Sequence, residues 1–302
     1  MPRKIVITGI TGFLGSRVAT AQVAAGNKVV GIVRPTSDLF RLAAIRDRIT
    51  LAYAGQESLA EIFDQGVDAV VHTATNYGRE NEPTIPLLEA NVAFPLSLVE
   101  TCLKYKVRAF INTDSFFSSN PSSHAYLAAY SASKRQFVER ARIAFAGSAV
   151  VFANVRIEHL YGPGDSDSKF VSWVVRECLN NVHQLKLTPG GQQRDFIYVD
   201  DAVSAICYLL DSAEFMSPGN HQLGLGTGTM ISIRSFIETV HRISGSTTEL
   251  NFGALPYRDH EQMASVAENS YFKGLGWVIR TGLDEGIRNI ILDIRKRATR
   301  TQ

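Results

Sequence analysis

Residues 4 to 15 read Lys4-Ile-Val-Ile-Thr8-Gly9-Ile-Thr-Gly12-Phe-Leu-Gly15. The first five have the β-branched character of a buried strand, and helical spacing begins at residue 13, so the glycines join a strand to a helix. There Gly9 suits a tight turn, Gly12 lets the backbone approach a pyrophosphate, and Gly15 allows close packing of the helix on the strand. The N–H groups at the start of the helix would bind the same pyrophosphate. Loops are rich in glycine, but this position between strand and helix favours a dinucleotide site over a structural turn.

The alternation of strands and helices continues along the first half of the chain. Buried-type strands are expected at residues 28–33, 49–52, 69–72, 109–113 and 150–156. Amphipathic helices are expected at residues 13–25, 87–105 and 126–145, and Pro95 should kink the second of them. Strands alternating with helices predict a doubly wound α/β fold, in which helices cover both faces of a parallel sheet.

The regular alternation of strands and helices ends after Tyr161-Gly-Pro-Gly164, where we expect the boundary between two domains. Residues 1–161 are predicted to form the dinucleotide-binding domain, and part of residues 194–230 is predicted to return to it. Residues 162–302 are predicted to form a smaller α/β domain for the substrate. The helices expected in this second half are residues 169–179, 199–210, 232–242 and 283–295.

Composition argues against several classes of function. The chain has 302 residues and a net charge of +2, which gives no reason to expect binding to nucleic acid or to an anionic membrane. Its three cysteines, Cys102, Cys178 and Cys207, lie far apart, which argues against disulfides and against a metal site. No signal-peptide core follows Met1, and no apolar run approaches the ~20 residues of a spanning helix. The sequence therefore predicts a soluble, cytoplasmic protein.

The end of the second predicted strand indicates which dinucleotide is bound. An NAD site has an acidic side chain there for the ribose 2′-hydroxyl, whereas an arginine suits a 2′-phosphate. This strand ends Val30-Gly-Ile-Val-Arg34, so a guanidinium stands in the acid's place, and Ser37 can add a hydroxyl. In the alternative, Arg34 is a surface residue and Asp38 reaches back to the ribose. Because Asp38 lies several residues into the loop, the pattern favours NADP(H).

Three residues near the middle of the chain predict a proton-transfer site. Tyr130 and Lys134 are spaced i and i+4, so they share one face of the expected helix, and Thr113 ends the strand before it. A phenol with a pKa near ~10 is a weak acid at neutral pH, but an ammonium and an oxidised nicotinamide nearby favour the phenolate. Such a set can protonate a ketone oxygen as hydride arrives. An ordinary helix pair exposed to solvent is the alternative.

These motifs together resemble the short-chain dehydrogenase/reductase superfamily in its extended form, the NAD-dependent epimerase/dehydratase family. The threonine before a G-x-x-G-x-x-G loop and a Y-x-x-x-K pair after the fifth strand carry the resemblance, which covers nearly the whole chain. It implies that Tyr130 is the proton donor, that Lys134 also holds the nicotinamide ribose, and that Thr113 hydrogen-bonds the substrate oxygen. It also implies cofactor contacts from Gly9, Thr11, Gly12, Phe13, Leu14, Thr73 and Ala74.

The segment Asn112-Thr-Asp-Ser-Phe-Phe117 resembles the S-T-D-E-V-Y segment of nucleotide-sugar 4,6-dehydratases. Those enzymes use the aspartate and the glutamate as acid and base to remove water. Here Asp114 is present, but Ser115 replaces the glutamate, and a serine hydroxyl without a partner is a poor general base. The resemblance therefore implies hydride and proton transfer without dehydration, with Asp114, Ser115 and Asn76 as substrate-binding residues.

Two later segments resemble the part of the family that binds the nucleotide sugar. Arg156-Ile-Glu-His-Leu-Tyr-Gly-Pro-Gly-Asp165 is similar to R-x-x-N-V-Y-G-P, and His159 falls on a substrate-contacting asparagine. Residues 193–201 match R-D-F-x-x-V-D-D, which implies that Arg194 binds the substrate pyrophosphate, and Arg258 falls on a second phosphate-binding arginine. In the alternative, either arginine belongs to a structural ion pair, for example Arg194 with Asp200 or Asp201.

Within the family, the likeness is greatest to nucleotide-sugar C4 reductases of the CDP-abequose and CDP-paratose synthase type. It implies NADPH-dependent reduction of the C4 ketone of a nucleotide-linked 4-keto-deoxyhexose, such as CDP-4-keto-3,6-dideoxyglucose, in O-antigen (lipopolysaccharide) biosynthesis. A 4-epimerase with tightly bound NAD and a non-catalytic cofactor-sensing protein are the alternatives. The family also implies a homodimer, in which residues 87–105 and 126–145 of two chains form a four-helix bundle. The nucleotide base and the stereochemistry of the product stay open.

Overall fold

The computed structural model describes residues 2–55, 57–78, 83–119, 127–212 and 216–300. The chain divides into two compact units, each of which is described by itself. Unit 1 comprises Met1–Arg156 and Val203–Leu223, and unit 2 comprises Ile157–Ala202 and Gly224–Gln302. The sequence placed the boundary after residue 161, whereas the units divide after Arg156. The difference arises because the segment that follows, His159–Tyr161, pairs with a strand of unit 2.

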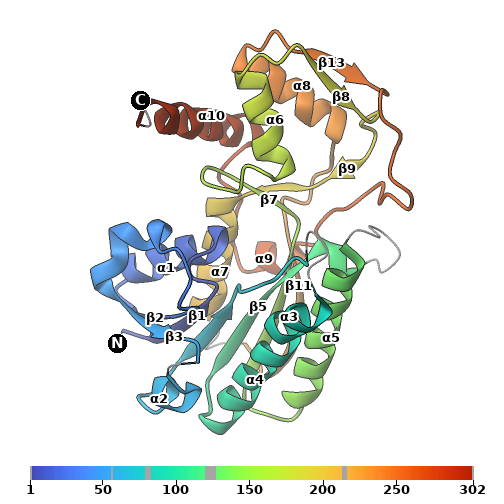
Figure 1. Ribbon diagram of the computed structural model, residues 1–302. Helices are drawn as coiled ribbons and strands as arrows, with labels where there is room; N and C mark the ends of the chain where they lie inside the picture. The colour runs from blue at the N-terminus through green and yellow to red at the C-terminus, as the bar shows by residue number, and fades with distance from the viewer. Residues whose placement is uncertain (1, 56, 79–82, 120–126, 213–215, 301–302) are drawn as a thin grey trace. The chain divides into compact units, whose positions relative to one another are not determined.

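Unit 1 is built on a seven-stranded parallel sheet with the strand order β11-β6-β5-β4-β1-β2-β3 (Figure 1). The strands are β1 (Lys4–Thr8), β2 (Lys28–Val33), β3 (Ile49–Tyr53), β4 (Ala69–His72), β5 (Ala109–Ser115), β6 (Val151–Ile157) and β11 (Gly219–Leu225). β1 pairs in parallel with both β2 and β4, so the strand order reverses at β1. Such a switch point is where doubly wound sheets bind ligands.

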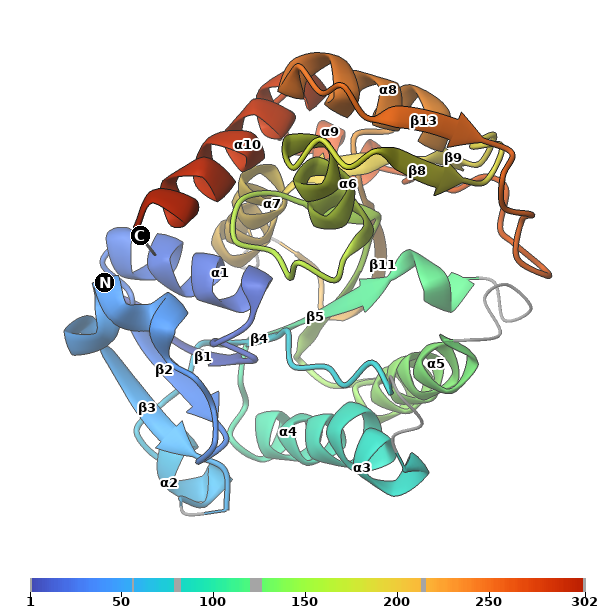
Figure 2. The same cartoon turned by 45° about the horizontal axis from the view of Figure 1, so that its top comes forward.

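Helices cover both faces of this sheet, which confirms the predicted doubly wound α/β fold. They are α1 (Phe13–Ala24), α2 (Leu59–Phe63), α3 (Thr84–Leu88), α4 (Phe94–Lys104), α5 (Ala128–Ala144) and α7 (Val199–Ser212), with the 3-10 segments η1 (Phe40–Arg48) and η3 (Phe116–Ser119). Helices α2, α4 and α5 share one core with the sheet, which includes Phe63, Val99, Phe110 and Phe137. Figure 2 shows α1 and α7 on the opposite side of β1 and β4 from α4.

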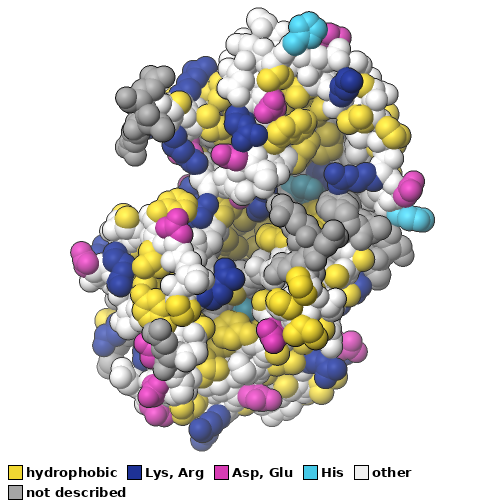
Figure 3. All heavy atoms as spheres, viewed as in Figure 1, with side chains coloured by type: hydrophobic (Ala, Val, Ile, Leu, Met, Phe, Trp, Pro, Cys, Tyr) yellow, Lys and Arg dark blue, Asp and Glu magenta, His cyan; other side chains and the backbone are white. Residues whose placement is uncertain are grey.

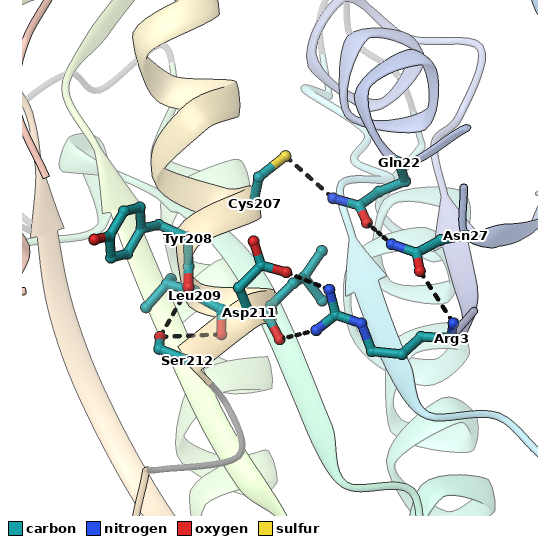
Figure 4. A network of polar contacts seen from close by, with 9 residues as sticks. Arg3, Gln22, Asn27, Cys207, Tyr208, Leu209, Asp211 and Ser212 are labelled. Carbon is teal, nitrogen blue, oxygen red and sulfur yellow. Dashed lines mark hydrogen bonds and ion pairs between the residues drawn. The ribbon is translucent and has the colours of Figure 1, made fainter. Parts of the chain in front are cut away.

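A polar network ties α7 to α1 and to the residues around β1 (Figure 4). The Gln22 amide donates to the Cys207 sulfur at 3.1 Å, and its oxygen accepts from Asn27 at 2.7 Å. The Asn27 amide oxygen also accepts the backbone N–H of Arg3 at 3.0 Å, and the Arg3 guanidinium pairs with Asp211. These contacts attach α7 to unit 1, and β11 in the same returning segment joins the sheet.

The helical stretch from Thr84 to Lys104 contains a π turn, η2 (Glu89–Ala93), between α3 and α4. The Phe94 N–H bonds to the Glu89 carbonyl, one residue farther back than in an α-helix. Pro95 has no N–H for the carbonyl four residues earlier, that of Asn91, and the wider turn accommodates the missing bond. The sequence predicted a kink at Pro95. The irregularity lies in the turn before it, and Pro95 sits in the first turn of α4.

By length and composition, Thr84–Lys104 is also the one helix among the described residues that could cross a membrane. The sequence predicted no such segment. Much of its apolar surface lies in the core of unit 1, where Leu87, Leu98, Val99 and Cys102 are at most 2% exposed. A core helix passes the same test of length and composition.

Unit 2 is a smaller α/β unit with a core of its own. Its described strands form three pairs: β7 (His159–Tyr161) with β10 (Phe196–Tyr198), β9 (Gln193–Arg194) with β12 (Ile231–Ser232), and β8 (Gln184–Leu187) with β13 (Glu249–Phe252). Its helices are α6 (Phe170–Leu179), α8 (Ile233–Ser244), α9 (Ser270–Gly274) and α10 (Leu283–Arg300). Phe236 stacks on Phe196 with ring centroids 4.3 Å apart, which joins α8 to the β7–β10 pair.

Candidate active site

The glycine loop between β1 and α1 has no room for a side chain at Gly9 or at Gly15. Gly9 has φ +66°, and a Cβ there would lie 2.6 Å from the backbone nitrogen of Ala74. A Cβ on Gly15 would collide with the carbonyl oxygen of Gly9, so α1 packs directly on the loop. Gly12 precedes α1 and provides no side-chain cap for its first N–H groups. Bare backbone and uncapped N–H groups at a switch point fit the pyrophosphate of a dinucleotide.

The end of β4 holds this loop in place. The Thr73 hydroxyl donates to the carbonyl oxygens of Thr8 at 2.8 Å and of Gly9 at 3.3 Å. Thr73 was predicted to contact the cofactor, and its hydroxyl is directed to the backbone of the glycine loop. His72 bonds through Nδ1 to the Thr8 hydroxyl at 2.7 Å and is packed among aromatic rings. Burial, together with the charge of Lys134, lowers the pKa of His72 to about 3, so the ring is neutral.

Arg34 and Arg41 both follow β2, Arg34 in the turn directly after the strand and Arg41 in η1. The Ser37 hydroxyl accepts the Arg34 backbone N–H at 3.1 Å and so closes the turn that follows the strand. Asp38 accepts the N–H of Phe40 at 2.9 Å, which directs its carboxylate to its own backbone. Arg41, in η1, donates to the carbonyl oxygen of Thr11 at 3.5 Å. Its guanidinium therefore reaches the glycine loop, a contact that the sequence did not predict.

Tyr130 and Lys134 are both buried on α5, each 3% exposed. The Lys134 ammonium donates to the carbonyl oxygen of Thr113 at 2.8 Å, so α5 is fixed against the end of β5. The Thr113 hydroxyl donates to the carbonyl oxygen of His72 at 3.1 Å. Burial lowers the pKa of Lys134, and the negative charge of Asp114 opposes this shift. The alternative of a solvent-exposed helix pair does not agree with this burial.

The surroundings of Tyr130 act on the pKa of its phenol in opposite directions. Ser115 follows Asp114 at the end of β5, and Thr75 lies after β4. The ring of Tyr77 stacks on that of Tyr130, with centroids 5.1 Å apart and planes inclined by 26°. Burial raises the pKa of Tyr130, whereas the hydrogen bonds from Ser115 and Thr75 lower it. Because burial is the largest cause, the phenol is protonated in the protein without its ligands.

Two predicted substrate residues are engaged with the protein itself. Asp114 accepts the backbone N–H of Ser115 at 2.8 Å, the hydroxyl of Ser118 at 2.8 Å and the amide of Asn154 at 3.2 Å. These bonds attach η3 and β6 to the end of β5, so Asp114 does not present a bare carboxylate to a sugar. Asn76 accepts the N–H of Gly78 at 2.9 Å with its side chain. This bond shapes the loop after β4.

Asn91 in the π turn is a further site residue that the sequence analysis missed. Its side chain accepts the N–H of Asn76 and donates to the carbonyl oxygen of the same residue, both at 2.7 Å. The amide also donates to Ser133 at 3.0 Å, and the Ser133 hydroxyl donates to the Tyr130 carbonyl at 2.7 Å. Asn91 thus connects the loop that carries Thr75 and Tyr77 to the helix that carries Tyr130. A proline four residues ahead was the available signal for an irregular turn at this residue.

In unit 2, Arg194 forms an ion pair with Glu261 at 2.8 Å, and their side chains are 4% and 12% exposed. The sequence suggested Asp200 or Asp201 as structural partners. Asp201 instead accepts two backbone N–H groups of the segment before α10, each at 3.0 Å. His159 lies in β7 with its ring 5.6 Å from that of Phe196, and Arg258 is exposed in the loop after β13.

Comparison with known proteins decides the family. Residues 5–224 match the model of the NAD dependent epimerase/dehydratase family. The chain belongs to that family. The CDP-abequose synthase of Salmonella muenchen is 32% identical to this chain over 292 residues, which cover 96% of this chain and 97% of that protein. The CDP-abequose synthase of Salmonella typhimurium is 33% identical over 296 residues, which cover 95% of this chain and 97% of that protein. The resemblance stated from the sequence is confirmed.

Solved structures share the fold of this epimerase/dehydratase-family chain. The UDP-glucose 4-epimerase of Thermotoga maritima, with UDP-glucose, superposes with a TM-score of 0.82 at 20% identity, covering 98% of this chain and 99% of the other. The UDP-glucuronic acid 4-epimerase of Bacillus cereus, in complex with UDP-glucuronic acid and NAD, has a TM-score of 0.82 at 21% identity, with 97% and 99% covered. At these identities the likeness concerns the fold alone.

Proposed function

We propose that this epimerase/dehydratase-family chain is an NADPH-dependent oxidoreductase that reduces the C4 ketone of a nucleotide-linked 4-keto-deoxyhexose. The contacts of Tyr130 carry the proposal. Lys134, one helical turn from Tyr130, is buried with it and donates to the Thr113 carbonyl oxygen of β5 at 2.8 Å. A phenol with an ammonium nearby can give a proton to a carbonyl oxygen. Dehydration needs a second acid–base group, which a serine in place of glutamate does not supply.

The reduction adds one hydride and one proton to the C=O group. A dinucleotide bound at the glycine loop would supply the hydride for the carbonyl carbon. As the π electron pair moves to oxygen, Tyr130 gives that oxygen its phenolic proton, and an alcohol results. The phenolate left behind is stabilised by the charge of Lys134 and by hydrogen bonds, and it regains a proton from water. Lys134 is also the residue that would hold the nicotinamide ribose.

NADP(H) is the proposed cofactor, and two features of unit 1 support it. Asp38 lies in the loop beyond the end of β2, and one of its carboxylate oxygens accepts the Phe40 N–H, so it does not stand where the acid of an NAD site would. Arg34 follows β2, and Arg41 brings a second guanidinium to the glycine loop. Two guanidinium groups can offer forked donors to a 2′-phosphate, and the Ser37 hydroxyl can add a third group.

The proposed substrate is a sugar linked to a nucleoside diphosphate, with CDP-4-keto-3,6-dideoxyglucose as the leading example. The two Salmonella relatives named CDP-abequose synthase support it. His159, Arg194 and Arg258 are the proposed contacts in unit 2, and Asn76, Asp114 and Ser115 are those in unit 1. All three of the second group also bond to the protein: Asp114 to Ser118, Asn76 to Gly78, and the Ser115 hydroxyl to the Phe117 N–H. Such a reaction would belong to cytoplasmic deoxysugar synthesis for O-antigen.

We further propose a homodimer in which α4 and α5 of two chains form a four-helix bundle. Exposed residues of α5 recur at helical spacing, at Ala132, Gln136 and Ile143, and Ile143 is 66% exposed. In α3, Ile85 is 64% exposed, and the space-filling view shows hydrophobic side chains over this helix (Figure 3). A second copy of the same surface would cover these side chains across a two-fold axis.

A melting-shift panel tests the proposal. NADPH is expected to raise the melting temperature more than NADH at equal concentration, and CDP more than UDP, dTDP or GDP, because ligands that bind the folded state stabilise it. A protein that purifies with tightly held NAD and does not respond to NADPH would favour the 4-epimerase. Binding of NADPH without turnover of any nucleotide-sugar ketone would favour the cofactor-sensing protein.

A further inference from the structure

Three buried polar side chains, those of Asn112, Asp114 and Asn154, lie together on one face of the sheet of unit 1. Side chains alternate along a strand, so Asn112 and Asp114 share their face of β5 with Phe110. The ring of Phe110 lies 6.2 Å from the ring of Phe137 on α5, so this is the face that α5 covers. A charge on Asp114 is therefore enclosed between the sheet and α5.

Hydrogen bonds fix the direction of the Asn154 amide. The Asn112 amide donates to the side-chain oxygen of Asn154 at 2.6 Å, so the NH₂ group of Asn154 faces other acceptors. Its two protons meet the Asp114 carboxylate at 3.2 Å and the side-chain oxygen of Gln222 at 2.8 Å. The Ser118 hydroxyl also contacts the carboxylate at 2.8 Å, but its single proton is shared with a backbone carbonyl oxygen at the same distance. Asn154 is therefore the side chain with a proton of its own for Asp114.

The ammonium of Lys134 lies next to this carboxylate. It donates to the carbonyl oxygen of Thr113 at 2.8 Å, and that carbonyl belongs to the peptide bond between Thr113 and Asp114. Covalent geometry then places the Asp114 Cα within about 6 Å of the ammonium nitrogen. Lys134 also lies one turn before Phe137 on the buried side of α5, which covers the Asp114 face of β5. In the described part of unit 1, the one buried carboxylate and the one buried Lys or Arg side chain therefore lie together.

A buried ammonium needs a negative charge nearby to keep its proton. Burial lowers the pKa of Lys134, and the charge of Asp114 opposes this shift. The donors that hold Asp114 are a backbone N–H, a hydroxyl and an amide, which fix its charge without cancelling it. In the proposed reduction Lys134 has to stay charged, because it stabilises the Tyr130 phenolate.

No other titratable or charged group that the neighbouring described elements bring near this pair carries a buried negative charge. These groups are His72 of β4, Tyr77 after β4, Glu89 of η2, Tyr130, Arg135 and Glu139 of α5, and Arg156 of β6. Glu89 and Glu139 are exposed, and His72 is neutral because its pKa is lowered to about 3. The charge beside Lys134 is therefore that of Asp114.

We propose that Asp114 is the counterion of Lys134, and that Asn154 is a positioning residue that holds the carboxylate beside the ammonium. The inference rests on the proposed reductase and goes beyond the substrate contact proposed for Asp114. While Tyr130 gives its proton to the ketone oxygen, the counterion keeps Lys134 charged next to the phenolate that forms.

A titration of Lys134 in the protein without ligands tests the pairing. The ¹³Cε resonance of Lys134, in protein with labelled lysine and assigned with Lys134→Arg, moves when the ammonium loses its proton. Asp114→Asn removes the charge at nearly constant size, and the midpoint is expected to fall by about one pH unit or more. Gln222→Ala is the matched control, because Gln222 accepts the other proton of the same amide. It should leave the midpoint unchanged.

Two variants of Asn154 test the positioning role. Asn154→Leu keeps the volume of the side chain but has no donor, and Asn154→Ser has a hydroxyl that is too short to reach the carboxylate. Either change lets the Asp114 carboxylate move, so the Lys134 midpoint is expected to fall, by less than in Asp114→Asn. A melting curve for each variant shows that the folded protein is being titrated.

The pH profile of ketone reduction extends the test to turnover. The high-pH limb of kcat, where Lys134 loses its proton, should move to lower pH in Asp114→Asn in step with the titration midpoint. A rise in KM for the ketone with an unmoved limb would confine Asp114 to a substrate contact and overturn the counterion.

The titration and the turnover assay separate this proposal from the proposed function. The same Lys134 midpoint in Asp114→Asn and in the wild type would overturn the counterion, even in a protein that reduces ketones. A midpoint that falls in Asp114→Asn but in neither Asn154 variant would overturn the positioning role. The expected midpoints in a protein that reduces no ketone would support the pairing and refute only the proposed function.

Discussion

Arg194 and Glu261 form a buried ion pair at 2.8 Å within unit 2. If Arg194 binds the substrate diphosphate, phosphate oxygens compete with Glu261 for one guanidinium. Glu261→Gln removes the competing charge and is expected to tighten CDP binding by roughly 3- to 10-fold. Arg194→Gln is expected to weaken it by roughly 10- to 100-fold, or about 1.4 to 3 kcal/mol. Titration calorimetry measures both.

Both changes break a buried pair, which costs about 3 to 5 kcal/mol of stability, so affinities are to be measured well below each melting temperature. Glu238→Gln is the matched control, because Arg234 and Glu238 form an exposed pair in the same unit at 3.8 Å. It should change neither stability nor CDP affinity. CDP affinities equal to wild type in the Arg194 and Glu261 variants would mean that the pair is purely structural.

Arg34 and Arg41 are expected to distinguish NADPH from NADH. Each Arg→Ala change should weaken NADPH binding by roughly 10- to 100-fold and leave NADH binding within about threefold, because only NADPH carries the 2′-phosphate. Arg41→Lys should be intermediate, since a lysine keeps the charge but not the fork. Fluorescence of the bound reduced nicotinamide gives the dissociation constants. Asp38→Asn separates the alternatives: a selective loss of NADH binding would place Asp38 on the ribose and contradict the NADP(H) assignment.

His72 is expected to make the free energy of unfolding depend on acidity. Its pKa is lowered to about 3 in the folded protein, against ~6.5 unfolded, so the unfolded chain binds the extra proton between these values. This contribution is fully present above pH ~6.5 and is lost as pH falls, by about 2 kcal/mol at pH ~5. Urea unfolding without ligands measures it. The His72→Asn side chain can still face the Thr8 hydroxyl but does not titrate. Between pH ~6.5 and pH ~5 its free energy of unfolding should fall by about 2 kcal/mol less than that of the wild type. The same dependence of the unfolding free energy on pH in both proteins would contradict this prediction.

The fold, and the shared burial of Tyr130 and Lys134 on one helix, have local signals in the sequence. The glycine spacing of residues 9–15 and the i, i+4 spacing of Tyr130 and Lys134 are each set within a few positions. The direction in which a side chain points depends on partners from other parts of the chain. Asp114 matches a substrate-contacting aspartate in sequence, but its oxygens are taken by Ser118 and Asn154, which come from η3 and β6.

The sequence also could not predict contacts between side chains that lie far apart along the chain. Arg194 and Glu261 are 67 residues apart, and neither spacing nor composition pairs them. Asn91 and Asn76 are 15 residues apart, and two hydrogen bonds between them fix the loop that carries Thr75.

Light scattering after size exclusion tests the homodimer, with twice the mass of one chain expected. Ile143→Glu places a charge on the exposed stripe of α5 and should give the mass of a single chain, because an unpaired charge in an apolar interface is costly to desolvate. Val278→Glu is the control, as Val278 is similarly exposed, at 59%, but lies in unit 2. A single-chain mass for the wild type contradicts the bundle.

Turnover of a defined ketone tests the central claim most directly. The protein is mixed with CDP-4-keto-3,6-dideoxyglucose and with NADPH deuterated at nicotinamide C4, and NADPH consumption and the NMR spectrum of the product are followed. The account predicts one NADPH oxidised per ketone and deuterium at C4 of the sugar. Tyr130→Phe should slow this by roughly 100-fold or more while keeping its affinity for NADPH. Unconsumed NADPH, a product without deuterium at C4, or an equally active Tyr130→Phe variant would contradict it.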